Sequence, residues 1–527
     1  MEKVKNAVIL AAGIGLRCVP LTYETPKALL KVHGTPIIER IIKQLHEKGI
    51  KEIIVVVGYK KEQFNYLKSY NVRLIYNPEY YYKNTLSSLY YVLKHLGNSY
   101  IIVADNYFNE NIFNRYEPYT WAGCAYAEGP THEWCVTLQE NRIHAVTIGG
   151  NDSYYMVGPA YFTAGFSEIF KKYIVEYYNR TGTEDYYWEN VLKENLDSLP
   201  VFINDLTGNV QDMDDLETLR AFDSCYKGDA NNFMLKTITS ALNIHGDLIT
   251  GIEPVKHGMT NYSFRFSVKE KRYIYRVPGE GTDKLINRKQ EYAVYKVISP
   301  LGIGDNPIYF DPETGHKITG FLEDTKTCNP FNSAQVKKCM KALRNFHNKK
   351  LEVNHTFDLF EQIDFYESLW KGYKPFFDDY YTTKAGILKI KNFIDICEKN
   401  RTLCHIDSAP VNFLLVGPEE EVVLIDWEYA GMQDAHSDIA TFAVNAGYNC
   451  VQIDDLINNY FLEGCSDKIR LKIYCYIAVV GFLWFNWCEY KRHLTGVEHG
   501  LYALNMYNYA KDYYQTFEQK SSYEVWE

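Results

Sequence analysis

Hydrophobic and polar positions follow two different patterns along the chain. Over about the first 220 residues, continuous apolar runs occur at 6–10, 52–57 and 100–103. Residues 36–48 instead place isoleucine and leucine at helical spacing. Buried strands separated by amphipathic helices predict a parallel sheet covered on both faces. We therefore expect an α/β fold that binds its ligands at the carboxyl ends of the strands.

The pattern changes after the polar segment 226–232, YKGDANN, which predicts a linker. Residues 264–268 and 272–277 alternate as an antiparallel hairpin, and beyond about residue 332 the chain becomes mainly helical. A sheet followed by helices is the order of an α+β, two-lobed, protein-kinase-like domain. We predict two domains, residues 1–228 and 232–527. The apolar run 473–485 is shorter than the roughly 20 residues that span a bilayer, and it predicts a buried helix.

Composition narrows the class of protein. The chain has 527 residues, 46% of them hydrophobic and 23% charged, which fits a globular protein of at least two domains. Its net charge of −10 argues against a general nucleic-acid binder. The 12 cysteines include no C-x-x-C pair, so reduced thiols and a cytoplasmic location are expected. The first apolar run leads directly into a glycine loop, which indicates a first strand and no membrane insertion.

A glycine loop follows the first predicted strand, in the sequence LAAGIGLRCVPLTYETPK at 10–27. Small residues allow backbone amides to approach a triphosphate, and basic side chains neutralise its charge. The candidates for these two roles are Ala11, Ala12, Gly13, Gly15, Arg17 and Lys27. The third glycine of a dinucleotide fingerprint is absent. The glycines alone fit a plain strand–turn–helix, whereas the arginine and the later Pro-Lys pair favour phosphate binding.

This stretch resembles the sugar-nucleotide pyrophosphorylase superfamily, and within it the bacterial phosphocholine cytidylyltransferases. The resemblance implies a Rossmann-like fold in which a substrate phosphate oxygen attacks the α-phosphorus of CTP with Mg²⁺ bound. Metal carboxylates are therefore expected: Asp105 follows a predicted strand, where such a ligand fits, and the resemblance favours Asp214, with Asp212 close behind. Trp134 and Tyr187 match pocket aromatics that hold a trimethylammonium group beside a carboxylate. Asp212 is the candidate carboxylate, although family members usually carry Glu there. Acidic residues are also favoured at the start of a solvent-exposed helix, which is the alternative interpretation of Asp212 and Asp214.

A second phosphate-handling motif lies near the other end of the chain. Residues 405–412, HIDSAPVN, match the pattern H-x-D-x-x-x-x-N of kinase catalytic loops. In such loops the Asp, here Asp407, accepts the substrate hydroxyl proton, and the Asn, here Asn412, binds Mg²⁺. Asp426, in the sequence IDWE, matches the second metal ligand.

From about residue 233 onward the chain resembles bacterial choline kinases. The resemblance implies that Gly258, Thr260 and Asn261 belong to a loop that covers the ATP phosphates, although His257 replaces the first of the usual paired glycines. Arg276 occupies the place of the strand lysine of protein kinases, and Glu291 is its expected partner. Arg276 alone could also be a surface strand residue.

The same resemblance implies an aromatic box for choline. Trp484 and Trp487 are three residues apart on a predicted helix, so both can lie on one face. Tyr509 is a third candidate. An aromatic stripe on a buried helix is also typical of an ordinary core.

The two resemblances together indicate a bifunctional enzyme that phosphorylates choline with ATP and couples phosphocholine to CTP. One alternative is the same chemistry on ethanolamine or another amino alcohol. Another is a sugar kinase joined to a sugar-phosphate nucleotidyltransferase, which would need polar pockets. A third is that one domain is catalytically dead, and the sequence speaks against it because Asp407, Asn412, Asp426, Arg17, Lys27 and Asp105 are all present. The sequence leaves the oligomeric state open.

Overall fold

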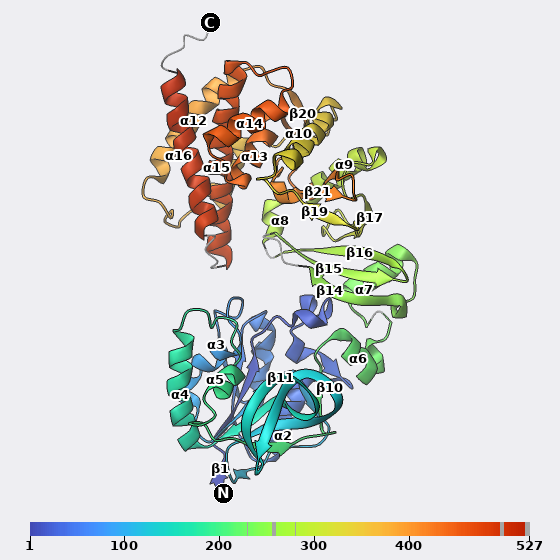
Figure 1. Cartoon of the computed structure of the whole chain (residues 1–527), viewed down its shortest axis with the longest axis vertical. Helices are drawn as coiled ribbons and strands as arrows, with labels where there is room; N and C mark the ends of the chain where they lie inside the picture. Colours follow the sequence, from blue (N-terminus) through green and yellow to red (C-terminus); the bar gives the residue numbers. More distant parts are fainter. Residues whose placement is uncertain (229, 256–259, 280, 496–499, 522–527) are drawn as a thin grey trace. The chain divides into compact units, whose positions relative to one another are not determined.

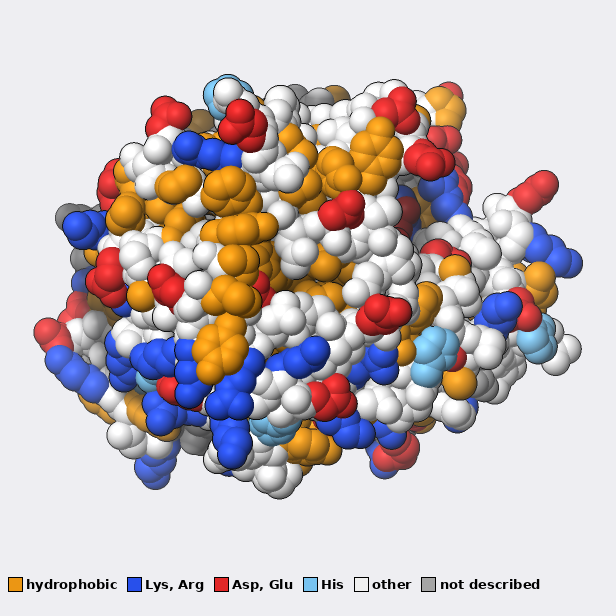
Figure 2. Space-filling model, turned by 90° about the horizontal axis from the view of Figure 1, so that it is seen from below, with side chains coloured by type: hydrophobic (Ala, Val, Ile, Leu, Met, Phe, Trp, Pro, Cys, Tyr) orange, Lys and Arg blue, Asp and Glu red, His pale blue; other side chains and the backbone are white. Residues whose placement is uncertain are grey.

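The chain forms two compact units, Met1–Pro254 and Val255–Glu527, in the computed structural model. The structure describes residues 1–228, 230–255, 260–279, 281–495 and 500–521 (Figure 1). Figure 2 shows one face of the molecule, on which basic side chains gather in one part and apolar side chains in another. Although the net charge of the chain is −10, this face is not uniformly acidic.

A seven-stranded sheet is the centre of the first unit, with strand order β10-β12-β11-β7-β2-β5-β6. Four neighbouring strands run parallel to one another: β7 (Ser99–Val103), β2 (Asn6–Ala11), β5 (Glu52–Val57) and β6 (Val72–Tyr76). The remaining strands are β10 (Trp121–Gln139), β11 (Arg142–Phe162) and β12 (Phe202–Asp205). Every residue of β2 is buried, as its unbroken apolar sequence predicts. The α/β prediction for this part of the chain is confirmed.

Helices pack against this sheet and complete its core. The helices described in this unit are α1 (Leu21–Glu24), α2 (Ile37–Glu47), α3 (Thr85–Tyr90), α4 (Ala164–Tyr178), α5 (Trp188–Glu194), α6 (Leu216–Phe222) and α7 (Phe233–Leu242). Figure 1 shows α3, α4 and α5 grouped together, and their apolar residues share one cluster with the sheet. Short strands complete the unit: β1 (Glu2–Lys3), β3 (Lys31–Val32), β4 (Thr35–Pro36), β8 (Asn106–Phe108), β9 (Tyr116–Glu117) and β13 (Val210–Asp212). β14 (Ile249–Val255) ends at the division between the units.

The second unit begins with an antiparallel sheet. Its strands are β15 (Asn261–Val268), β16 (Lys271–Pro278), β17 (Pro307–Phe310) and β18 (Lys317–Gly320). β15 and β16 form the predicted hairpin, with full antiparallel register from Asn261–Pro278 to Val268–Lys271. Two helices follow the hairpin, α8 (Thr282–Leu285) and α9 (Arg288–Ile298).

The rest of the second unit is mainly helical, as predicted. Its helices are α10 (Ser333–Asn348), α11 (Leu359–Leu369), α12 (Tyr380–Ile396), α13 (His436–Ala446), α14 (Cys450–Tyr460), α15 (Asp467–Thr495) and α16 (Gly500–Ser521). β19 (Thr325–Thr327) precedes α10, and four short strands lie between α12 and α13: β20 (Arg401–Cys404), β21 (Phe413–Val416), β22 (Glu421–Leu424) and β23 (Gly431–Asp434). The hairpin of β21 and β22 separates the two acidic motifs of this unit.

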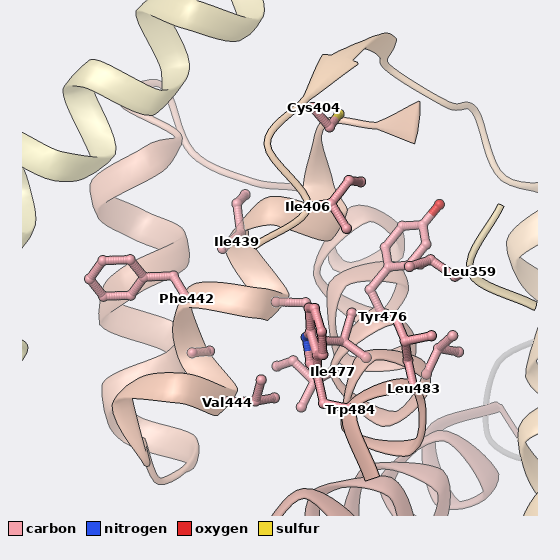
Figure 3. Packing of buried hydrophobic residues seen from close by; sticks show 14 of the residues in the cluster. Leu359, Cys404, Ile406, Ile439, Phe442, Val444, Tyr476, Ile477, Leu483 and Trp484 are labelled. Atoms are coloured by element: carbon pink, nitrogen blue, oxygen red, sulfur yellow. The ribbon is translucent and has the colours of Figure 1, made fainter. Parts of the chain in front are cut away.

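The long helix α15 forms the centre of this helical part. Among the described residues it is the one helix long and apolar enough to cross a membrane, but its most apolar stretch is entirely buried within the protein. Figure 3 shows its residues Ile477 and Trp484 beside Val444 of α13, and Leu483 and Ile439 belong to the same apolar cluster. The prediction of a buried helix at 473–485 is confirmed.

Candidate active sites

The glycine loop of the first unit follows β2 at the carboxyl edge of the parallel sheet. Gly15 has φ +71°, and a Cβ there would lie 3.0 Å from the Lys27 Cβ and 3.1 Å from a Thr22 methyl carbon. Glycine is therefore required by both conformation and space. The Thr22 hydroxyl donates a hydrogen bond to the Gly15 carbonyl at 3.0 Å, which closes the loop. A Cβ added at Gly13 would meet no described heavy atom within 4 Å, so the backbone there is open to a ligand.

Three carboxylates assemble next to this loop, although they come from distant parts of the sequence. β8 pairs antiparallel with β13, and this pairing places Asp212 opposite Asn106. The Met213 amide also donates to the Asp105 carbonyl at 3.1 Å. As a result, carboxylate oxygens of Asp105, Asp212 and Asp214 lie within 4.8 Å of one another. Carboxylate oxygens at this spacing fit the donor set of a hard divalent cation.

Both predicted basic residues contact this acidic group. Lys27 Nζ lies 2.7 Å from Asp105 Oδ2 and 3.4 Å from Asp214 Oδ1, and Arg17 Nη2 lies 2.6 Å from Asp214 Oδ1. Burial alone would raise the pKa of Asp105, but the Lys27 ammonium lowers it overall. Burial, and then the carboxylates of Asp105 and Asp214, raise the pKa of Asp212. The arrangement is thus a charged cluster able to hold both a cation and phosphate groups.

The predicted aromatic pair of this unit is also brought together. The rings of Trp134, on β10, and Tyr187, at the start of α5, meet edge to face with centroids 6.2 Å apart. A cavity of about 450 Å³ contains the glycine loop, Lys27, Asp105, Asp214 and Tyr187. It is also lined by residues 80–85, YYYKNT, which sequence reasoning missed. Their position beyond the carboxyl end of β6 was the available signal, since ligands of α/β folds bind there.

In the second unit the catalytic-loop motif follows β20 with an unusual backbone. Ile406 has φ +69°, a conformation that a β-branched residue adopts only when its surroundings hold it. Asp438 of α13 provides that hold, because its buried carboxylate accepts the amides of His405 at 2.8 Å and Ile406 at 2.7 Å. The His347 ring lies 2.9 Å from the same carboxylate. Asp438 was not singled out from the sequence, and it is 31 residues beyond Asp407.

Asp407 and Asn412 of this loop lie near Asp426 of the second acidic motif. The Asn412 amide donates to the Asp407 carbonyl at 2.7 Å and to its carboxylate at 3.2 Å. Asp426 follows β22 and also has a left-handed backbone, with φ +66°. Burial and the neighbouring Asp426 and Glu428 carboxylates raise the pKa of Asp407 well above its usual range. Burial and then Glu428 raise the pKa of Asp426 to about 7.

A buried charge network joins the sheet of this unit to the acidic motif. Arg276 on β16 makes two hydrogen bonds to Glu291 of α9, at 2.6 and 3.0 Å, so the predicted pair is present. Arg276 Nη1 also lies 3.7 Å from both Asp426 and Glu428. Glu428 in turn accepts from Arg288 at 3.1 Å and from the Asn261 amide at 2.8 Å.

The phosphate-covering loop is described only from Thr260. Gly258 lies outside the described residues. The Thr260 carbonyl accepts the Gly279 amide at 3.0 Å, and its hydroxyl accepts from the Asn261 amide at 3.3 Å. A cavity of about 550 Å³ is lined by Gly279, Glu428 and Tyr429.

The tryptophans of α15 meet at an aromatic cluster beside this acidic motif. Trp484 and Trp487 are 5% and 2% exposed, and their ring centroids are 6.5 Å apart. Tyr429, which directly follows IDWE, packs edge to face on Trp484 at 5.3 Å and accepts a hydrogen bond from the Trp487 indole at 3.1 Å. Tyr509 donates its hydroxyl to the Tyr448 carbonyl at 2.7 Å. Tyr429 was missed in the sequence, although its place next to the acidic motif could have indicated it.

Comparison with known proteins gives a separate result for each unit. Residues 7–108 match the MobA-like NTP transferase domain, and residues 252–456 match the family described as Choline/ethanolamine kinase. The α/β class of the first part and the kinase-like α+β class of the second are thereby confirmed. The two domains occur in one chain, as the sequence predicted.

Individual relatives match each part over nearly their full length. A choline-phosphate cytidylyltransferase of Streptococcus pneumoniae is 37% identical over 227 residues, which cover 42% of this chain and 99% of that protein. A 2-aminoethylphosphonate cytidylyltransferase of Lancefieldella rimae is 37% identical over 231 residues, covering 42% of this chain and 93% of the relative. The crystal structure of choline kinase LicA from Streptococcus pneumoniae is 27% identical, with a TM-score of 0.48, covering 54% of this chain and 98% of that one.

Proposed function

Because the chain belongs to the choline-phosphate cytidylyltransferase family through its first unit and carries a choline/ethanolamine kinase domain in its second, we propose that it catalyses two consecutive reactions. It phosphorylates choline with ATP, and it couples the resulting phosphocholine to CTP, releasing CDP-choline and pyrophosphate. The observation that supports this most is the presence of two separate acidic clusters, each beside a basic side chain and an aromatic pair. The product of one reaction is the substrate of the other.

In the kinase reaction the choline hydroxyl oxygen attacks the γ-phosphorus of ATP, and the bond to the β-phosphate oxygen breaks. The hydroxyl proton passes to the Asp407 carboxylate, which Asn412 orients through its amide. Arg276, fixed by Glu291, places positive charge near Asp426. Trp484, Trp487 and Tyr429 form the aromatic surface for the trimethylammonium group. Gly258, Thr260 and Asn261 cover the phosphates of ATP in this proposal.

In the cytidylyl transfer a phosphocholine phosphate oxygen attacks the α-phosphorus of CTP, and pyrophosphate leaves. The nucleophile is already an anion, so the reaction depends on positioning and charge neutralisation. Ala11, Ala12, Gly13 and Gly15 present the backbone to the triphosphate, while Arg17 and Lys27 neutralise its charge. Trp134 and Tyr187 contact the choline group.

Mg²⁺ is the proposed cofactor of both reactions. Asp105 and Asp214 would hold it in the first unit, and Asn412 and Asp426 in the second, because oxygen donors of this kind suit this ion. When bound, it neutralises charge on the transferring phosphate groups. We also propose domain limits of 1–228 and 232–527, a cytoplasmic location, and small molecules as the partners.

Amino phosphonates are a second candidate for the first unit, because the relative that acts on 2-aminoethylphosphonate is as similar as the choline-phosphate relative. The kinase domain favours a phosphate ester, since a kinase makes a C–O–P linkage from an alcohol and cannot make the C–P bond of a phosphonate. The aromatic pair also favours a quaternary ammonium, which has no N–H groups to satisfy.

The test is a competition among acceptors. The purified chain is given CTP and Mg²⁺ with equal concentrations of phosphocholine, phosphoethanolamine and 2-aminoethylphosphonate, and the products are separated by mass. We expect CDP-choline to dominate. Preferential use of either primary amine would contradict the choline assignment.

A further inference from the structure

A second buried cation lies beside Arg276 in the antiparallel sheet of the second unit. Lys317 on β18 pairs directly with Arg276 on β16, so both side chains leave the same face of the sheet. Lys317 is 4% exposed, and its Nζ lies 2.9 Å from Asp305 Oδ2. The same Nζ donates a hydrogen bond to the Tyr295 hydroxyl at 2.5 Å, and this hydroxyl donates to Asp305 Oδ1 at 2.7 Å. The three side chains thus form a closed ring of contacts.

This ring attaches α9 to the sheet one helical turn away from the Arg276 contact. Glu291 and Tyr295 are four residues apart on α9, so they lie on the same side of the helix. Glu291 accepts the hydrogen bonds of Arg276, whereas Tyr295 contacts Lys317. Two successive turns of α9 are therefore held to neighbouring strands, and a buried cation is used at each of them.

Stability alone does not account for the buried charges of the ring. Replacing a buried ion pair by apolar groups of similar volume is often neutral or stabilising, because removing charges from water is costly. Burial alone would raise the pKa of Asp305, but Lys317 and the Tyr295 hydroxyl lower it overall, which favours the charged form of the pair. Charged groups joined by hydrogen bonds differ from apolar contacts in fixing a direction as well as a distance. The ring therefore sets the orientation of α9.

The orientation of α9 determines where Glu291 holds Arg276. The two hydrogen bonds between these residues are 2.6 and 3.0 Å long, and Arg276 Nη1 lies 3.7 Å from Asp426. The Lys317 ammonium also acts electrostatically on Glu291 and on Asp426, so its charge lies near the same site. A rotation of α9 would carry Glu291 with it and change the position of the guanidinium.

We propose that Lys317, Asp305 and Tyr295 are positioning residues of the kinase reaction, which fix α9 so that Glu291 holds Arg276 in place for the phosphates of ATP. This inference rests on the proposed function, because it assumes that Arg276 binds ATP. The three residues act through α9 and need not touch the nucleotide themselves.

The experiment measures ATP affinity in the full-length protein. Tyr295→Phe removes only the hydroxyl that joins α9 to Lys317 and Asp305, and it leaves both charges in place. We expect it to raise the Kd for ATP with Mg²⁺, measured by calorimetry, by about tenfold, as loss of one hydrogen bond to a charged group usually does. The KM for ATP should rise in parallel, and the KM for choline should stay at the wild-type value. Lys317→Met should raise the Kd for ATP at least as much.

Tyr292→Phe is the matched control, because it makes the same chemical change on the same helix. Tyr292 packs edge to face on Phe310, outside the ring, so this variant should bind ATP as the wild type does. Simple loosening of the fold would lower the kinase kcat or weaken ATP and choline equally, and either result without a selective loss of ATP affinity would overturn the proposal. Unchanged ATP affinity in Tyr295→Phe would overturn it as well.

A double-mutant cycle tests the route of the effect. If Tyr295 acts through Glu291, then Tyr295→Phe should cause little further loss of ATP affinity in a Glu291→Gln background. A full and independent loss in that background would contradict the proposed route. Because calorimetry with ATP needs no choline, failure of the wild-type protein to phosphorylate choline would overturn the proposed function while this test still gave its own answer.

Discussion

Three acidic residues of the second unit lie so close together that each disfavours the negative charge of the others. Asp407, Asp426 and Glu428 lie together, and among the described side chains Arg276 and Arg288 are the basic groups in ion-pair contact with this acidic group. The pKa of Asp407 is raised well above its usual range by burial and by the two neighbouring carboxylates. A carboxylate with a raised pKa is a stronger base once ionised, which suits proton transfer from an alcohol.

Replacing Asp407 should therefore stop one reaction only. For Asp407→Asn we expect the kinase kcat to fall by about 10²–10⁴-fold, the usual contribution of a general base. Cytidylyl transfer from supplied phosphocholine should be unchanged, because the acidic cluster of the first unit is complete without it. Both rates are measured on the same preparation, and Asp455→Asn, at an exposed position of α14, is the control. Loss of both activities would show that the two sites are not separate.

The converse change is Asp105→Asn in the first unit. Asp105 is the 2.7 Å partner of Lys27 and one of the three clustered carboxylates. We expect cytidylyl transfer to fall by at least about 10²-fold, comparable to the loss of one preorganised charge-stabilising group. Phosphocholine formation from choline and ATP should stay at the wild-type rate. A variant that kept its cytidylyl transfer would remove Asp105 from the proposed metal site.

At the scale of elements, α13 holds the catalytic loop through a single residue, Asp438. Asp438 accepts the amides of both His405 and Ile406, and the Ser408 hydroxyl donates to its carbonyl at 2.6 Å. These contacts hold Ile406 in its left-handed backbone and thus set the direction of Asp407. Asp438 is a positioning residue in this arrangement.

Asp438→Asn should weaken that arrangement without removing it. The asparagine side chain has one oxygen, so it can accept a hydrogen bond from only one of the two backbone N–H groups, and its own NH₂ group faces the other. We expect this to lower the free energy of unfolding by about 1–3 kcal/mol. We expect a lower kinase kcat, a nearly unchanged KM for ATP, and normal cytidylyl transfer. Denaturant unfolding and steady-state kinetics measure the two effects. Unchanged kinase kcat would show that the loop does not depend on α13.

Several strands and helices could be predicted from the sequence, but the contacts between distant strands could not. β2, β5 and α2 were predicted because their apolar periodicity is local, and the hairpin of β15 and β16 for the same reason. The pairing of β8 with β13, which gathers Asp105, Asp212 and Asp214, connects segments about 100 residues apart and was not predictable from pattern. Asp105 was chosen for its place after a buried strand, whereas Asp214 and Asp212 came from family resemblance.

Residues that act through tertiary contacts were missed for a related reason. Asp438 and Tyr429 have no motif of their own, and their importance appears only from the groups that they contact. Trp484 was correctly placed on a buried helix, but its contact with Tyr429 required the structure.

At the scale of the whole molecule, each unit has its own group of acidic residues beside basic side chains. The acidic cluster of the first unit and the catalytic loop of the second share no residue. Phosphocholine made by one unit should therefore be usable by a different molecule.

A mixture of two variants, each of which keeps only one of the two activities, tests this prediction. Asp407→Asn retains the first site and Asp105→Asn retains the second, so neither should convert choline to CDP-choline alone. Together they should restore the conversion, detected by mass with choline, ATP, CTP and Mg²⁺. If the mixture stayed inactive while each variant kept its single activity, transfer of phosphocholine through solution would be excluded.

The central claim, that one chain performs both steps on choline, is tested most directly by supplying the wild-type protein with choline, ATP, CTP and Mg²⁺ and following products by mass. We predict CDP-choline, lost when ATP is omitted and restored without ATP when phosphocholine replaces choline. Phosphocholine that accumulates without CDP-choline would contradict the assignment of the first unit. Product from ethanolamine but none from choline would contradict the aromatic recognition proposed for both units.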